Sequence, residues 1–125
     1  MTAQSLSCPS ATIFRIANLI FMTDTEFHKI ADAFMTGLED RLDAADIEWE
    51  RAPGGVMQIE FDNGTQIIIN KQPFLHEIWV AAKSGGFHYR REGDSWIDTR
   101  SDDELIAALS RYCSEQAGRS VMLNH

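Results

Sequence analysis

The sequence predicts an α+β fold, a two-layer α/β sandwich in which two helices pack on one face of an antiparallel sheet of about six strands. Three observations support this prediction. An apolar stripe at helical spacing lies early in the chain, a series of short alternating segments follows it, and a second amphipathic segment comes near the end. Because each helix must bury its own stripe, we expect both to lie side by side on the same face of the sheet.

The first helix is expected to begin after Thr23. The sequence Thr23-Asp24-Thr25-Glu26 matches a capping box, in which Thr23 and Glu26 satisfy each other's backbone N–H groups. Acidic residues in the first turn also favour the helix dipole. The apolar residues that follow, at spacings close to 3.6 residues, are Phe27, Ile30, Ala31, Phe34, Leu38 and Leu42.

Six short strands are predicted next, at residues 47–51, 56–61, 65–70, 76–83, 87–91 and 95–98. Glycine-rich turn sequences separate most of them, and Asp62-Asn63-Gly64 is a strong hairpin signal. Residues 70–73 are expected to be irregular. Successive hairpins of this kind make a meander with one face against the helices and the other toward water.

The closing helix is expected to start at a second capping-box sequence, residues 101–104. Gly118 is expected to cap its C-terminus. Its buried side is predicted to consist of Leu105, Ile106, Leu109, Tyr112 and Cys113.

Residues 1–21 differ in composition from the rest of the chain. They contain no acidic residue and one basic residue, Arg15, and they lack the basic start and small-residue cleavage site of a secretory signal. One arginine is also too few for an organellar transit peptide. We expect residues 1–21 to be a leader or disordered extension, Met22 to be the functional start, and residues 22–125 to form a single domain.

The net charge of −8 argues against nucleic-acid binding and favours a cationic partner, either a protein or a metal. Residues 22–50 carry nine acidic side chains and two basic ones, so most of this charge lies on the first helix and the strand after it. Cys8 and Cys113 can form neither a disulfide framework nor a complete metal cage, which favours a reducing compartment. No apolar run approaches the roughly 20 residues of a membrane span.

The acidic residues suggest a site for hard cations. His28, Asp32, Glu39 and Asp43 fall on one flank of the first helix. Carboxylates on this flank and on the next strand favour oxygen-seeking ions, with magnesium, calcium or manganese ahead of iron on ligand chemistry alone. The site would be shallow and its binding weak. A solvated helix face explains the same pattern, and composition alone favours that explanation.

Trp79 is predicted to lie on the solvated face of the sheet. If Ile78 and Val80 point into the core, Glu77 and Trp79 point away from it. Exposed aromatic residues are enriched at protein interfaces, although a covering loop would also account for the position. Nucleophilic catalysis finds no support, because the sequence has no nucleophile elbow, catalytic Cys/His motif or phosphate-cradling glycine pattern.

Two segments resemble the frataxin family. The segment INKQPFLHEIWVAAKSGGFHY is similar to the family's central motif, and DTEFHKIADAFMTGLEDRLD is similar to the first helix of bacterial frataxins. The resemblance extends from about Met22 to Leu123. It implies an α–β sandwich and a small acidic protein that binds ferrous and ferric iron weakly and takes part in iron–sulfur cluster assembly. It further implies contact with a cysteine desulfurase and an iron–sulfur scaffold protein, and a bacterial cytoplasmic location.

The resemblance also assigns candidate residues. The implied iron-binding ridge consists of Asp24, Glu26, His28, Glu39, Asp40, Asp43, Asp46, Glu48 and Glu50. The implied partner contact on the sheet consists of Asn70, Lys71, Gln72 and Trp79. Ala44 and Ala45 stand where bacterial relatives often carry an acid or an aromatic residue, which predicts a lower iron capacity.

Three functions remain open at this point. The leading hypothesis is a non-enzymatic assembly factor, an iron-responsive regulator or iron donor that docks on the desulfurase. The second is an enzyme that oxidises ferrous iron, and the third is a protein-interaction module whose acidity concerns only docking and solubility. The protein is expected to be a monomer that can associate when it is loaded with iron.

Overall fold

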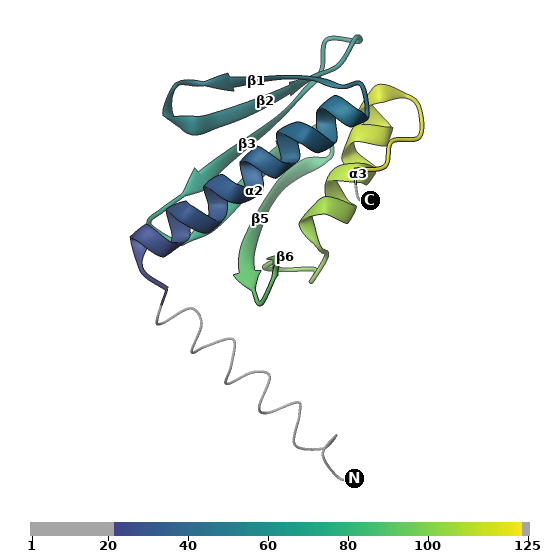
Figure 1. Ribbon diagram of the computed structural model, residues 1–125. Helices are drawn as coiled ribbons and strands as arrows, with labels where there is room; N and C mark the ends of the chain where they lie inside the picture. Colours follow the sequence, from purple (N-terminus) through teal and green to yellow (C-terminus); the bar gives the residue numbers. More distant parts are fainter. Residues whose placement is uncertain (1–21, 124–125) are drawn as a thin grey trace, which may run out of the picture.

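The computed structural model describes residues 22–123, so the predicted leader at residues 1–21 lies outside the described residues. The chain forms a helix, six strands and a second helix (Figure 1). Their bounds are α2 Asp24–Ala44, β1 Glu48–Ala52, β2 Val56–Glu60, β3 Gln66–Gln72, β4 Glu77–Ala82, β5 Gly85–Glu92, β6 Ser95–Asp98 and α3 Leu105–Ala117. A short 3₁₀ turn, η1 Pro53–Gly55, joins β1 to β2.

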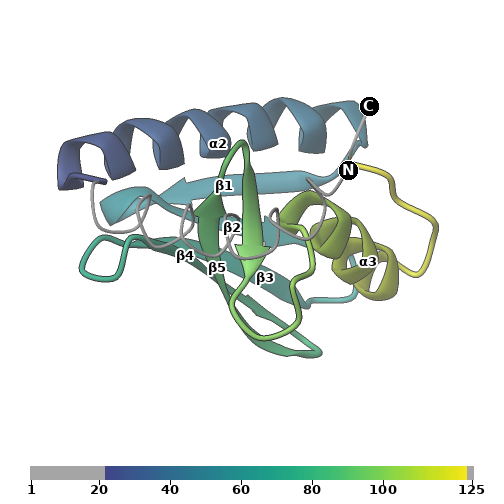
Figure 2. The ribbon, with the colours of Figure 1, turned by 90° about the horizontal axis from the view of Figure 1, so that it is seen from below.

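The strands form one sheet in sequence order, and each pairs antiparallel with the next. Both helices lie on the same face of this sheet (Figures 1 and 2). The predicted two-layer sandwich is therefore confirmed. No helix within residues 22–123 is long and apolar enough to cross a membrane.

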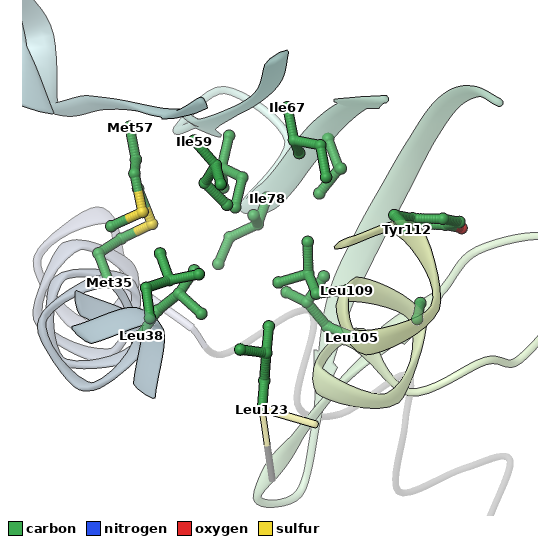
Figure 3. Packing of buried hydrophobic residues seen from close by; sticks show 14 of the residues in the cluster. Met35, Leu38, Met57, Ile59, Ile67, Ile78, Leu105, Leu109, Tyr112 and Leu123 are labelled. Atoms are coloured by element: carbon green, nitrogen blue, oxygen red, sulfur yellow. The ribbon is translucent and has the colours of Figure 1, made fainter. Parts of the chain in front are cut away.

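The core fills the space between the helices and the inner face of the sheet. Met35 and Leu38 of α2 face Met57 and Ile59 of β2 (Figure 3), and all four are fully buried. Leu123, in the segment after α3, is buried in the same cluster. Burial of one such side chain contributes roughly 1.5–3 kcal/mol, so this layer supplies much of the stability of the fold.

The predicted capping box at the start of α2 is confirmed. The backbone N–H of Glu26 donates to Thr23 Oγ1 at 3.0 Å, and the backbone N–H of Thr23 donates to Glu26 Oε1 at 2.9 Å. The fully buried stripe of α2 includes Met35, which the sequence pattern missed, whereas Ile30 and Phe34 lie half-buried at its edge.

The predicted start of the closing helix was wrong. Asp102 has a φ of 65°, a left-handed conformation that cannot belong to a helical turn. The N-cap is instead Glu104, whose carboxylate accepts hydrogen bonds from the N–H groups of Ile106 and Ala107 at 2.9 and 3.0 Å. The C-terminal prediction is confirmed, because Gly118 caps α3 with a φ of 71°.

The segment expected to be irregular is mostly strand. Residues 70–72 continue β3 and pair with β4, with Asn70 opposite Trp79 and Gln72 opposite Glu77. The chain turns only at residues 73–76, where His76 takes a φ of 55°. Proline at 73 lacks the N–H needed to extend the ladder, so it marks the end of the strand rather than the middle of an irregular stretch.

Candidate functional site

Both ridge residues of β1 lie on the same face of that strand. Trp49 and Arg51 pair with the buried residues Ile59 and Met57, so these two side chains lie on the inner face beside α2. The alternate residues of β1, Glu48 and Glu50, therefore point to the outer face. This is the same face that carries Trp79, because Trp79 alternates with the buried Ile78 and Val80. Glu48 and Glu50 are thus the two carboxylates of β1, and both lie on its outer face.

Carboxylates on the flank of α2 contact donors of the sheet. Glu39 Oε2 accepts a hydrogen bond from Arg51 Nη1 at 2.7 Å, and Asp43 Oδ1 accepts one from Trp49 Nε1, also at 2.7 Å. The Arg51 cation compensates the charge of Glu39 locally. The neutral indole leaves the negative charge of Asp43 uncompensated, so Asp43 retains more of its charge than Glu39 does.

The N-terminal half of α2 makes separate contacts. Lys71 Nζ donates to Asp32 Oδ1 at 2.6 Å and lies 3.1 Å from His28 Nδ1. Asp24 Oδ1 lies 2.7 Å from His76 Nε2. Since a helix rises 1.5 Å per residue, Asp24 and Asp43 are about 28 Å apart along the axis. The predicted ridge is therefore too long to be one binding site.

The remaining ridge residues differ in their availability. Glu26 is engaged in the capping box through its side chain. Asp40 is exposed on α2 and lines a groove with Met122 and Leu123. Asp46 is exposed after the helix, with a φ of 61°.

A surface hollow collects the acidic side chains at the junction of α2 and β1. Its volume is about 550 Å³, and Ile47 and Trp49 form part of its wall. The carboxylates that line it are Asp43, Asp46, Glu48, Glu50 and Glu60. Glu60 was missed from the sequence, although the hairpin register that places it opposite Glu48 could have identified it.

The hollow has the chemistry of a hard-cation site but not the geometry of a preformed one. All of its charged ligands are oxygens, which suit ions such as Fe²⁺, Mn²⁺ or Mg²⁺. Within residues 22–123 no group of three or more His, Cys, Asp or Glu side chains is arranged closely enough to hold one ion. Any bound cation would therefore keep much of its water, and its binding would be weak.

A second cluster surrounds Trp79 on the outer face. The half-buried indole stacks on His88, with ring centroids 4.3 Å apart and planes 9° from parallel. Its Nε1 donates to Glu77 Oε1 at 2.8 Å, and Arg90 Nη2 donates to Glu77 Oε2 at 3.0 Å. Glu77 was expected to be solvated, but it is only 4% exposed because these larger side chains surround it.

The predicted partner contact divides between the two faces. Asn70 and Gln72 lie on the outer face, opposite Trp79 and Glu77 in the ladder. Lys71 lies on the inner face, where it contacts the N-terminal half of α2. His88 and Arg90 join the outer cluster instead. The turn that sets this register lies at residues 83–84, and Gly85 and Gly86 already belong to β5. A turn placed at the two glycines gives a different register, so the sequence did not identify His88 and Arg90.

Among residues 22–123, the buried Cys113 and Tyr89 are poor nucleophiles. Burial raises the pKa of the Cys113 thiol to about 12, so this thiol stays protonated at neutral pH. Burial and the adjacent Tyr112 hydroxyl raise the pKa of Tyr89 well above its ordinary value. Both groups belong to the core.

Comparisons with known proteins are consistent with this architecture. The family model described as a frataxin-like domain matches residues 20–119. The iron-sulfur cluster assembly protein CyaY of Aeromonas salmonicida is 50% identical over 103 residues, which cover 81% of this chain and 98% of that protein. CyaY of Cupriavidus necator is 49% identical, with 82% and 96% covered.

Solved structures show the same similarity. A frataxin from Psychromonas ingrahamii superposes with a TM-score of 0.76 at 32% identity, over 83% of this chain and 100% of that one. A trimeric frataxin from Saccharomyces cerevisiae, complexed with ferrous iron, gives a TM-score of 0.57 at 26% identity, over 75% of this chain and 87% of that one.

Proposed function

The chain belongs to the frataxin family, and on that premise we propose that it is a non-enzymatic factor of iron–sulfur cluster assembly that binds iron weakly and docks on a cysteine desulfurase. Its relatives at about 50% identity are named iron-sulfur cluster assembly proteins, and the alignments span nearly their whole length. In this proposal iron is the cargo or signal, and the docked complex adjusts the rate at which clusters form.

Support for iron binding comes from the hollow between α2 and β1. Five carboxylates line it, and the indole bonded to Asp43 leaves the charge of that group uncompensated. A loosely held, largely hydrated ferrous ion fits such a surface. Because the ligands are solvated, we expect the affinity to fall as salt rises.

Support for docking comes from the shared outer face, which is the observation that carries the proposal. Glu48 and Glu50 on β1 face the same side as Trp79 on β4, three strands away. At about 4.8 Å per strand this separation is roughly 14 Å, well within one protein interface. One partner could therefore meet the acidic end with basic residues and contact Trp79 with apolar ones.

The same geometry links iron to docking. A ferrous ion in the hollow would neutralise part of the charge that attracts a basic partner surface. Iron and the desulfurase would then compete for Glu48 and Glu50. Such competition makes docking responsive to iron without any conformational change.

The test is the affinity of the full chain for a bacterial cysteine desulfurase, measured with and without ferrous iron under anaerobic conditions. The variants are Trp79→Ala and the double change Glu48→Lys with Glu50→Lys, and the control is Glu115→Lys on the exposed side of α3. We expect both test variants to bind much more weakly than the control. Wild-type affinity in both test variants would refute docking through this face.

Oxidation of ferrous iron is the competing function. It requires a defined site where iron and oxygen react repeatedly, and the carboxylates of the described residues are dispersed. Iron oxidation in air no faster than in buffer would support the assembly factor. Oxidation with turnover that disappears in Glu39→Ala with Asp43→Ala would favour the enzyme instead.

A further inference from the structure

Glu77 is a buried carboxylate on the face of the sheet that no described helix covers. It is 4% exposed, although the outer-face residues Ala81, Gly86 and His88 nearby are exposed. Burial of a charged group is costly unless that group is paired and hydrogen-bonded. A carboxylate in this position therefore requires an explanation.

Both oxygens of Glu77 are engaged by neighbouring side chains. Oε1 accepts from Trp79 Nε1 at 2.8 Å, and Oε2 accepts from Arg90 Nη2 at 3.0 Å. Arg90 stands directly opposite Glu77 in the β4–β5 ladder, and His88 stands opposite Trp79. His88 Nδ1 also lies 3.9 Å from Glu77 Oε1. Four side chains on two strands thus hold one another in a single arrangement.

This arrangement restrains the Trp79 ring in two ways. The stack on His88 defines the plane of the indole, with 9° between the rings. The hydrogen bond to Glu77 holds the Nε1 edge of the indole toward Glu77. Charge-assisted hydrogen bonds of this kind are stronger than neutral ones, so Glu77 is the main restraint on rotation of the ring within its plane.

We propose that Glu77 is a positioning residue that holds the Trp79 indole in the orientation that docks, an inference that rests on the proposed docking through Trp79. A preordered indole loses less conformational freedom when a partner binds. The removal of Glu77 therefore weakens docking without removing any atom of Trp79.

The arrangement also defines the kind of contact that the partner makes. Because the indole N–H already donates to Glu77, it is not available to an acceptor on the partner. Beside the indole, Ala81 pairs with Gly86 across the ladder, and both are exposed with little or no side chain. An apolar side chain of the partner fits above these two small residues, against the indole ring.

The experiment compares Glu77→Leu, which fills the volume but accepts no hydrogen bond, with Glu77→Gln, which keeps a carbonyl acceptor. The control is Glu115→Gln on α3. In ¹⁵N-labelled full chain, NMR follows the indole N–H resonance of Trp79, assigned by its loss in Trp79→Ala. Affinity for the cysteine desulfurase is measured for every variant.

In Glu77→Leu the Trp79 indole N–H is expected to shift and to exchange faster with water, and docking is expected to weaken by about 3- to 10-fold, the effect of freeing one ordered side chain. Adding Trp79→Ala to Glu77→Leu causes no loss beyond that of Trp79→Ala alone, because the two residues act as one unit. Glu77→Gln retains the protected N–H and most of the affinity, which a purely electrostatic role would not allow.

The outcomes separate the two proposals. If Trp79→Ala weakens docking and Glu77→Leu does not, Glu77 does not position the ring and this inference is overturned while docking through Trp79 stands. An unchanged Trp79 N–H resonance and exchange rate in Glu77→Leu overturns the inference by itself. If Trp79→Ala docks as wild type does, docking through Trp79 fails, and the function assigned to Glu77 fails with it.

Discussion

Glu60→Gln tests whether the carboxylates of the hollow repel one another. Glu48 and Glu60 are directly opposite in the β1–β2 ladder, a position in which Cβ atoms are about 5 Å apart. If the two carboxylates keep this separation, they repel in water by about 0.8 kcal/mol, and the repulsion is smaller when the side chains spread apart. Removal of one charge should therefore raise the free energy of unfolding by about 0.5–0.8 kcal/mol at low ionic strength.

For a domain of this size, that gain corresponds to a rise in Tm of about 2–6 °C. The assay is thermal unfolding at low and high salt. At 1 M salt, where the Debye length is about 3 Å, the gain should largely disappear. Ferrous iron added anaerobically should raise the Tm of the wild type more than that of the variant, because the variant has one ligand fewer and less repulsion to relieve.

Glu115→Gln is the matched control, because it makes the same change in net charge at an exposed position on α3. If Glu60→Gln is no more stable than Glu115→Gln at low salt, the carboxylates of the hollow do not repel one another. They would then be too far apart to share a cation, and the hollow would not be an iron site.

Three further predictions concern the fold. Thr23→Ala should lower the free energy of unfolding by about 1 kcal/mol through loss of the cap, measured by urea unfolding; a loss no larger than that of Thr25→Ala would contradict it. Leu38→Ala should cost about 2–5 kcal/mol because it opens a cavity in the fully buried core, and the exposed Thr36→Ala should leave the urea midpoint nearly unchanged. The pKa of Cys113 is raised from its ordinary value of 9.0 to about 12; the unfolded thiol loses its proton first, so stability should fall as pH rises from 9 to 12. Cys113→Ala should lack this component of the pH profile, and an identical profile would contradict it.

Much of the fold could be predicted because local patterns and global packing agree. The capping box at Thr23 and the alternating strands are consistent with the sandwich that they form. The start of α3 could not be predicted from its capping-box sequence. The Asp98 carboxylate accepts hydrogen bonds from the N–H groups of Arg100 and Ser101, and this turn delays the helix to Leu105.

The candidate site was harder to predict, because residues that are close in sequence lie on opposite faces. Lys71 and Asn70 are neighbours along β3, yet one contacts α2 and the other lies beside Trp79. Alternation along a strand could have separated them. The burial of Glu77 could not have been predicted in this way, because it depends on how the side chains of a neighbouring strand close over the carboxylate.

The functional assignment of the site residues remains a prediction. Asp24 and Glu26 lie far from the hollow along α2, and Glu39 is paired with Arg51. We therefore expect the iron-dependent behaviour to be concentrated at Asp43, Glu48 and the other carboxylates of the hollow. Variants at the N-terminal end of α2 should have a smaller effect on iron binding.

Whether docking and iron binding share one surface is tested most directly by an NMR footprint of the ¹⁵N-labelled full chain with a bacterial cysteine desulfurase and, separately, with ferrous iron. We expect the desulfurase to broaden amide signals across the outer face from Glu48 and Glu50 to Trp79. We expect paramagnetic Fe²⁺ to broaden signals around the hollow, so that the two footprints overlap at β1. A desulfurase footprint confined to the helical face, or an iron footprint that does not include the hollow, would contradict this expectation.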